Sequence, residues 1–150
     1  MPLDYVASST NNTLDSADVS IAVSPASGVI NTTTMIPGQT VQGLINVSNT
    51  GNVDEHYYVT AAWNAGGTTS DHKAALLAEY LNVSVTASPS TSLFTGKLTE
   101  LIDQPTSPGR ALTQATGNED VIFSFNLPST VSPVVNNIDL SIDFVFVASS

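Results

Sequence analysis

The fold is decided by the stretch IDLSIDFVFV, residues 138–147. Apolar side chains fall at every second position, and aspartate or serine stands between them as far as Asp143. Successive side chains of a β-strand point to opposite faces, so this alternation predicts a ten-residue strand with one buried face. Val145 and Val147 make the second face apolar as well, which predicts that this end of the strand is covered on both sides.

Further runs of alternating residues predict a chain built mainly of strands. Residues 19–23 and 121–126 alternate between apolar and polar side chains, and a proline follows each run. Residues 81–87 alternate in the same way, with leucine and valine on one face. Valine, isoleucine, phenylalanine and threonine recur in these segments, as is typical of β-strands.

The middle of the sequence contains the turn signal NTGN, residues 49–52. Residues 41–48 before it and residues 56–63 after it are rich in β-branched and aromatic side chains. Two such segments joined by a short turn containing asparagine and glycine are typical of a β-hairpin. The sequence therefore predicts that these two segments pair with each other.

Two short segments have helical spacing instead. In DHKAALLAEY, residues 71–80, alanine and leucine recur on one face, and Thr69, Ser70 or Asp71 is expected to cap the helix. The segment GKLTELI, residues 96–102, is expected to form about one and a half helical turns.

These elements predict an all-β fold: a jelly-roll-like β-sandwich of about seven or eight strands with one or two short helical insertions. A length of 150 residues fits one hydrophobic core, and we expect the single domain to span residues 17–150. Residues 1–16 form a polar extension in this scheme. They are either a frayed terminus or a strand that pairs with another molecule.

Charge and composition exclude several functions. Three basic residues stand against thirteen acidic ones, which gives a formal net charge of −10, and the chain has no cysteine. Three cations cannot neutralise a run of phosphates, so nucleic-acid binding is excluded and anionic membrane surfaces are disfavoured. Without cysteine there is no disulfide framework, thiolate metal site or cysteine nucleophile. No apolar run approaches the ~20 residues of a membrane span.

The polar residues are of a kind typical of secreted proteins, because Ser, Thr and Asn make up about a third of the chain and lysine is rare. Four Asn-x-Ser/Thr sequons are candidate glycosylation sites, unless they arise by chance in such a chain: Asn11, Asn31, Asn46 and Asn82. The first residues lack the basic and apolar regions of a signal peptide. The composition therefore favours a mature extracellular or cell-surface form over a cytosolic protein.

No arrangement of residues predicts catalysis, and we expect no enzyme activity. His56 and His72 do not form a His-Glu-x-x-His pair, and neither a nucleophile elbow nor a glycine-rich phosphate loop is present. The carboxylates suit Ca²⁺ better than any other cofactor. Asp139 and Asp143 share a strand face and are the candidate calcium ligands, with solubilising charge as the alternative.

Several motifs carry a family resemblance. The segments PGQTV at residues 37–41, INVSNTGN at residues 45–52 and YYV at residues 57–59 resemble the central motif of the TasA/camelysin family. These are secreted fibre-forming proteins of biofilm matrices, with related bundling pili in archaea. FTGKLTELI, residues 94–102, resembles the family's short helical insertion, and the likeness covers about residues 17–148. Camelysin relatives have carried a metalloprotease label, but no zinc-ligand set is recognisable in this sequence.

The resemblance implies a secreted subunit that polymerises with identical subunits into an extracellular filament. In such fibres the N-terminal segment of one subunit adds as a donor strand to the sheet of the next, which matches the separate extension at residues 1–16. Leu3, Tyr5 and Val6 are the candidate donor-strand residues. Leu3 and Tyr5 share one face of a strand, and we expect that face to enter the acceptor groove.

Two other functions remain open on the sequence. A monomeric Ig-like cell-surface module would bind its ligand at the loops and would pack an ordered N-terminus on its own sheet. A hydrolase would need a concave cluster of titratable groups, which the sequence does not display.

Overall fold

The computed structural model describes residues 16–25, 36–135 and 138–150. These residues form eight β-strands, one α-helix and two short 3-10 helices. The strands are β1 (Ile21–Ser24), β2 (Thr40–Asn49), β3 (Glu55–Ala65), β4 (Asn82–Ala87), β5 (Thr91–Lys97), β6 (Arg110–Leu112), β7 (Asn118–Asn126) and β8 (Leu140–Ser149). The helical elements are α1 (Asp71–Tyr80), η1 (Leu98–Glu100) and η2 (Pro133–Val135).

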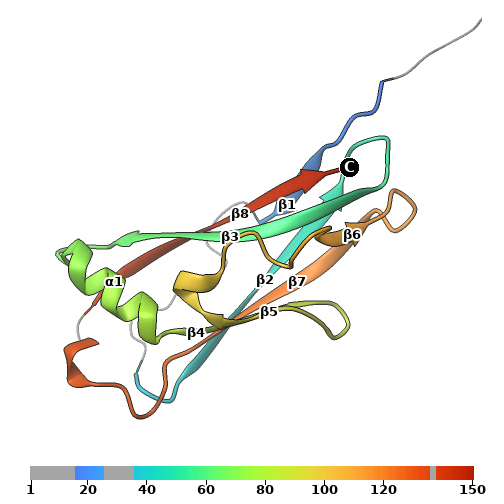
Figure 1. Cartoon of the computed structure of the whole chain (residues 1–150). Coiled ribbons are helices and arrows are strands. Elements are labelled where there is room, and N and C mark those ends of the chain that lie inside the picture. The colour runs from blue at the N-terminus through green and yellow to red at the C-terminus, as the bar shows by residue number, and fades with distance from the viewer. Residues whose placement is uncertain (1–15, 26–35, 136–137) are drawn as a thin grey trace, which may run out of the picture.

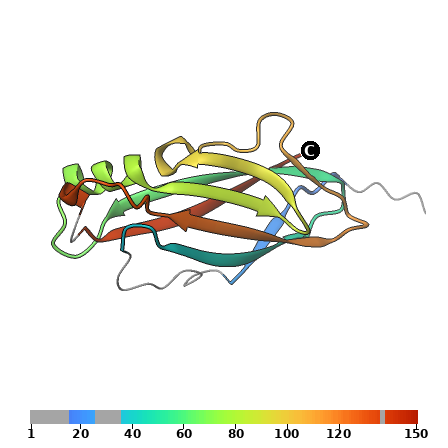
Figure 2. The same cartoon turned by 90° about the horizontal axis from the view of Figure 1, so that it is seen from below.

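The strands form two antiparallel sheets that lie face to face (Figures 1 and 2). The larger sheet has the strand order β1-β2-β7-β4-β5, and the smaller sheet has the order β6-β3-β8. This arrangement confirms the predicted all-β sandwich of about eight strands with short helical insertions.

The alternation along the strands builds the core between the sheets. Val47, Val85 and Phe123 of the larger sheet and Val59 of the smaller one are fully buried. The ring of Phe123 stacks on that of Phe144 in β8, with 4.0 Å between the ring centroids. Aromatic contacts of this kind stabilise a core beyond the area they bury, so the two sheets are joined near β7 and β8.

The predicted hairpin over residues 49–52 is wrong. β2 pairs with β1 and β7, whereas β3 pairs with β6 and β8, so this turn carries the chain from one sheet to the other. The Asn49 side chain fixes the crossing, because its Nδ2 donates to the carbonyls of Val53 at 2.8 Å and Leu112 at 3.1 Å. Its Oδ1 accepts from the Gly51 N–H at 3.0 Å, as in an Asx turn.

The helix predicted over residues 71–80 is confirmed as α1. Ser70 is its N-cap, and the Ser70 Oγ accepts from the Lys73 N–H at 3.3 Å. Ala74 and Ala78 are fully buried on the face that the helix turns toward the sandwich. α1 therefore covers one end of the core, next to β3 and β5.

The second predicted helix, over residues 96–102, is shorter than expected. β5 continues to Lys97, and only Leu98–Glu100 form a 3-10 helix. The pattern of leucines in this segment still marks the buried positions, because Leu98 and Leu101 are both buried.

The chain then runs along one edge of β3. The Ala61 N–H donates to the Leu101 carbonyl at 2.9 Å, and Val59 exchanges two backbone hydrogen bonds with Gln104 at 2.6 and 3.0 Å. Leu101 and Gln104 thus bond to the edge of β3 that β6 leaves free. We call α1, η1 and residues 101–109 the closed side of the sandwich.

Candidate functional site

The opposite side of the sandwich ends in an unpaired strand. β8 pairs with β3 along its whole length, from Leu140 opposite Ala65 to Ser149 opposite His56. Within the described ranges, no strand pairs with the other edge of β8. An edge strand presents backbone N–H and C=O groups that can pair with a further strand, so β8 is a candidate site for strand addition.

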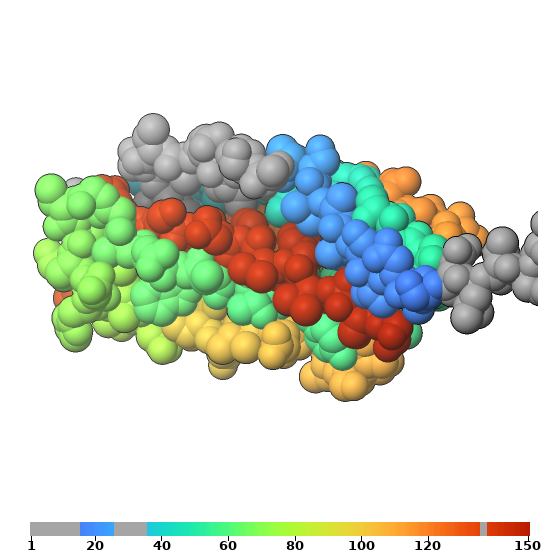
Figure 3. Space-filling model, turned by 90° about the horizontal axis from the view of Figure 1, so that it is seen from above, coloured from blue at the N-terminus to red at the C-terminus, as the bar shows by residue number. Residues whose placement is uncertain are grey.

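The larger sheet is also incomplete on this side. β1 lies against the C-terminal part of β8 (Figure 3) and pairs with residues 46–49 of β2. In the part of the chain that the structure describes, residues 40–45 of β2 pair with β7 but have no strand on their other edge. We call the free edge of β8 together with the free edge of residues 40–45 the open side.

The apolar face of β8 lies at the margin of the core. Its inward side chains are only half-buried, although they pack against fully buried residues such as Val121 and Phe123 of β7: Leu140, Ile142, Phe144 and Phe146. A half-buried aromatic row along an unpaired strand edge leaves room for the side chains of an added strand to pack beside it.

The outward face of β8 is also apolar, and it is exposed, next to Phe144 and Phe146 in the strand. Val145 is 44% exposed and Val147 is 51% exposed, so the expectation that this end of the strand is covered on both sides is wrong for the described chain. Alternation predicts which face a residue is on, but a second apolar face does not show what covers it.

The first described residues, 16–20, lie at one end of the sandwich. The Asp18 N–H donates to Asn52 Oδ1 at 2.7 Å, and the Asn52 N–H donates to the Asp18 carbonyl at 3.0 Å. A Cβ on Gly51 would lie 2.0 Å from the Asp18 carbonyl oxygen, so only glycine permits this approach. The NTGN link therefore fixes the segment before β1 at the end of the sandwich where β8 ends (Figure 1).

Glu55 is buried beneath this segment. The side chain is 1% exposed, Oε2 accepts from the Ser20 N–H at 3.2 Å, and Oε1 has no hydrogen-bond partner in the described structure. Burial raises the pKa of Glu55, the charge of Asp18 raises it further, and the Ser20 hydrogen bond opposes both effects. The residues next to Glu55 in the sequence give no signal of this burial, which depends on the segment before β1.

A second polar cluster joins the two sheets near the closed side. The Tyr57 hydroxyl donates to Glu119 Oε1 at 2.6 Å, and Arg110 donates through Nε and Nη2 to the two Glu119 oxygens at 3.0 and 2.9 Å. Burial and the Glu119 carboxylate raise the pKa of Tyr57, and the bond to Glu119 raises the pKa of Arg110. Every group in this cluster is paired, so it stabilises the fold and has no free group for chemistry.

The candidate donor residues Leu3, Tyr5 and Val6 and the sequon residues Asn11 and Asn31 lie outside the described residues. So does almost all of the proposed 1–16 extension, and its boundary stays a prediction.

The other two sequons lie on the outer face of the larger sheet. Asn46 Nδ2 donates to Asn118 Oδ1 at 3.1 Å and to Asp120 Oδ1 at 3.0 Å. Asn82 Oδ1 accepts from Lys97 Nζ at 2.7 Å. Asn46 therefore engages the same amide nitrogen that would carry a glycan, whereas Asn82 engages its oxygen.

The candidate calcium ligands are not brought into a common site. Asp143 is exposed on the outer face of β8 opposite Ala62, and Asp139 lies before the strand. The Asp139 backbone is held by Gly66 and Thr69, at 2.9 and 2.8 Å. Among residues 16–25, 36–135 and 138–150, no three His, Cys, Asp or Glu side chains are grouped so that they could hold a metal ion.

No helix in the described part of the chain has the length and apolar character needed to cross a membrane. The sequence matches no protein-family model and no curated protein.

Proposed function

We propose that this protein is the structural subunit of an extracellular filament and that it polymerises by N-terminal donor-strand exchange. The observation that carries the proposal is the edge of β8 that no described strand pairs with, although β1 lies against its C-terminal part. β8 is a ten-residue strand with half-buried phenylalanines on its inner face. The family resemblance of residues 17–148 and the Ser-, Thr- and Asn-rich composition support the same function.

The chemistry of the contact follows from β-augmentation. Backbone groups of the incoming segment would hydrogen-bond to the free edge of β8, and its side chains would alternate between the two faces of the extended sheet. Leu3 and Tyr5 would enter beside Phe144 and Phe146, and Val6 would lie on the outer face near the exposed valines of β8. Leu3 and Tyr5 make one face of the donor apolar, and Val6 shares the other face with Asp4. On the acceptor, the exposed outer-face valines are Val145 and Val147.

The contact is head-to-tail, because the donor segment and the acceptor edge are different surfaces of the same chain. A heterologous contact that does not close on itself produces filaments. The segment before β1 is fixed at the end of the sandwich where β8 ends. A donor segment would therefore extend from one end of the subunit and not from its middle.

Deletion of residues 1–12 tests the proposal. The full chain should form filaments in negative-stain electron microscopy, and the deletion variant should be a folded monomer by size-exclusion chromatography and circular dichroism. Ser8→Ala with Thr10→Ala provides a control within the same segment, and Leu3→Ser with Tyr5→Ser should reproduce the deletion. Filaments that persist without residues 1–12 would exclude donor-strand exchange through this segment, and a full chain that stays monomeric would favour the Ig-like binding module.

A further inference from the structure

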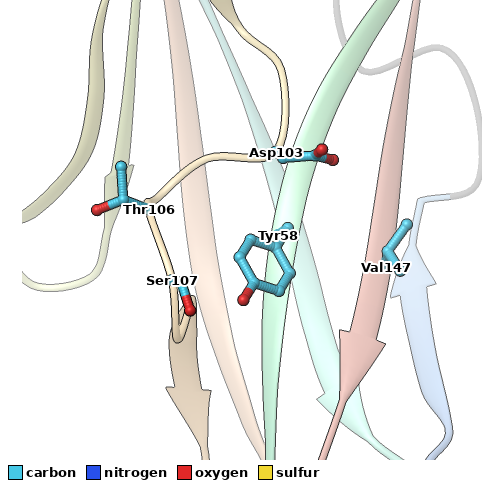
Figure 4. A pocket seen from close by; sticks show the side chains of 5 residues that line it. All are labelled: Tyr58, Asp103, Thr106, Ser107 and Val147. Carbon is cyan, nitrogen blue, oxygen red and sulfur yellow. The ribbon is translucent and has the colours of Figure 1, made fainter.

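A hollow lies on the outer face of the smaller sheet and reaches from residues 103–107 across β3 to Val147 of β8. It has a volume of about 510 Å³ and is lined by Tyr58, Asp103, Thr106, Ser107 and Val147. Figure 4 shows the ring of Tyr58 face-on between the chain segment that carries the three polar residues and the β8 strand that carries Val147. The hollow therefore combines an aromatic floor, one apolar wall and a polar wall.

The ring of Tyr58 is held in place by its surroundings. Tyr58 lies opposite Val147 in the β3–β8 pairing, which places both side chains on the same outer face. Gly109 has a positive φ of 93°, and a Cβ there would lie 3.1 Å from the Tyr58 Cζ. The same Cβ would lie 2.8 Å from the Tyr57 carbonyl oxygen, so glycine at this position lets the chain pack closely against the ring.

The carboxylate of Asp103 is fixed at the rim by an unusual backbone conformation. Asp103 has a φ of 48° and is the one non-glycine residue with positive φ in the described ranges. Its N–H donates to Thr60 Oγ1 at 2.9 Å, and the Thr60 hydroxyl donates to Asp103 Oδ1 at 3.2 Å. This conformation costs free energy, and its location beside an aromatic floor points to a role in binding.

The chemistry of the hollow fits a sugar ring. A pyranose has an apolar C–H face that can stack on an aromatic ring and a rim of hydroxyls that both donate and accept hydrogen bonds. The Asp103 carboxylate accepts hydrogen bonds, and the hydroxyls of Thr106 and Ser107 do both.

The charges favour a neutral sugar over an acidic one. Arg110 is committed to Glu119, and the other two cations, Lys73 and Lys97, lie on α1 and β5. Asp103 and a net charge of −10 repel anionic ligands. We infer that the Tyr58 hollow is a binding site for a neutral pyranose unit of a polysaccharide. The site shares Val147 with the outer face of β8 that a donor strand would flank, but the inference does not rest on filament formation.

Isothermal titration of the full chain tests the inference, with cellohexaose, mannohexaose, maltohexaose and hexa-N-acetylchitohexaose as neutral probes. Hexagalacturonate serves as the acidic probe. At least one neutral probe should bind, and Tyr58→Ala should weaken that binding about tenfold or more. Tyr58→Phe keeps the ring and should stay within about threefold of the natural chain, as should the control Tyr80→Ala on α1.

A second variant separates binding from folding. Asp103→Gly removes the carboxylate but suits the positive φ, so it should fold as well as the natural chain and still bind several-fold more weakly. Failure of all four neutral probes at millimolar concentration, binding that survives Tyr58→Ala, or binding of hexagalacturonate alone would overturn the inference.

Discussion

The closed side and the open side of the sandwich differ in how far the described chain covers the core between the sheets. On the closed side, α1, η1 and residues 101–109 cover the gap between the sheets and bury Ala74, Ala78, Leu98 and Leu101. On the open side, the described chain ends in the free edges of β8 and of residues 40–45, with Phe144 and Phe146 half-buried. The closed side is completed by its own chain, whereas no described strand completes the open side, which is the side that we propose as an interface.

From this difference we expect that one set of residues determines the stability of the fold and another set determines assembly. Residues on the closed side should determine the free energy of unfolding, because their environment is complete within one chain. Residues on the outer face of the open side should change assembly and leave folding almost unaffected, because the described chain does not cover them. Each prediction below tests one part of that division.

The largest expected effect is on the closed side. Leu101→Ala removes a fully buried side chain and leaves a cavity beside β3, so the free energy of unfolding should fall by about 2–5 kcal/mol. Urea denaturation followed by circular dichroism measures the change. At urea concentrations below its unfolding midpoint, the variant should still form filaments. A variant that keeps its stability but loses assembly would contradict the division.

A smaller effect is expected on the open side. Val145→Asp places a charge beside the free edge of β8, and filament formation should slow about tenfold while the free energy of unfolding changes by no more than about 0.5 kcal/mol. Ile102→Asp is the matched control, because Ile102 is an exposed apolar residue on the closed side, 57% exposed against 44% for Val145. Light scattering of both variants checks the prediction, and equal slowing in both would show that charge alone is responsible.

The smallest effect concerns Glu55, which accepts a hydrogen bond from the Ser20 N–H just before β1. Because the pKa of Glu55 is raised from 4.5, the folded protein holds this proton more tightly than the unfolded chain does. The stability contributed by the group is present below pH 4.5 and is lost as the pH rises through the folded-state value.

Glu55→Gln removes the buried charge and should raise the free energy of unfolding at pH 7 by about 1 kcal/mol. The difference from the natural chain should vanish near pH 4, where Glu55 is protonated. Urea titrations at the two pH values measure it. A variant that is less stable at pH 7 would show that the ionised carboxylate is favourable in the folded state.

Much of the fold could be predicted from the period of the sequence, because burial on one face imposes alternation on a strand. The stretch at residues 138–147 and the helix at residues 71–80 were predicted in this way. The partner of each strand could not be predicted, since alternation defines a face and not a neighbour. The NTGN turn therefore suggested a hairpin, whereas the Asn49 side chain holds it as a crossing between sheets.

The sites were less predictable for the same reason. The burial of Glu55 depends on the segment before β1, which is distant in the sequence and leaves no local signal. The Tyr58 hollow depends on Gly109 and on a positive φ at Asp103, whose roles appear only once residues 101–109 lie along β3. The two apolar faces of β8, by contrast, were visible in the sequence, and only their exposure was missed.

A cysteine cross-link between two copies tests the central claim most directly. The chain has no cysteine, so Val6→Cys in one copy can be mixed with Val145→Cys or Val147→Cys in a second copy of different mass. Donor-strand exchange places position 6 beside one of these outer-face positions, within the short Cβ separation that a disulfide requires. Mild oxidation should therefore give disulfide dimers between the two variants and none with Ile102→Cys, a 57% exposed position on the closed side. Equal cross-linking to position 102, or no cross-link between copies, would contradict the account.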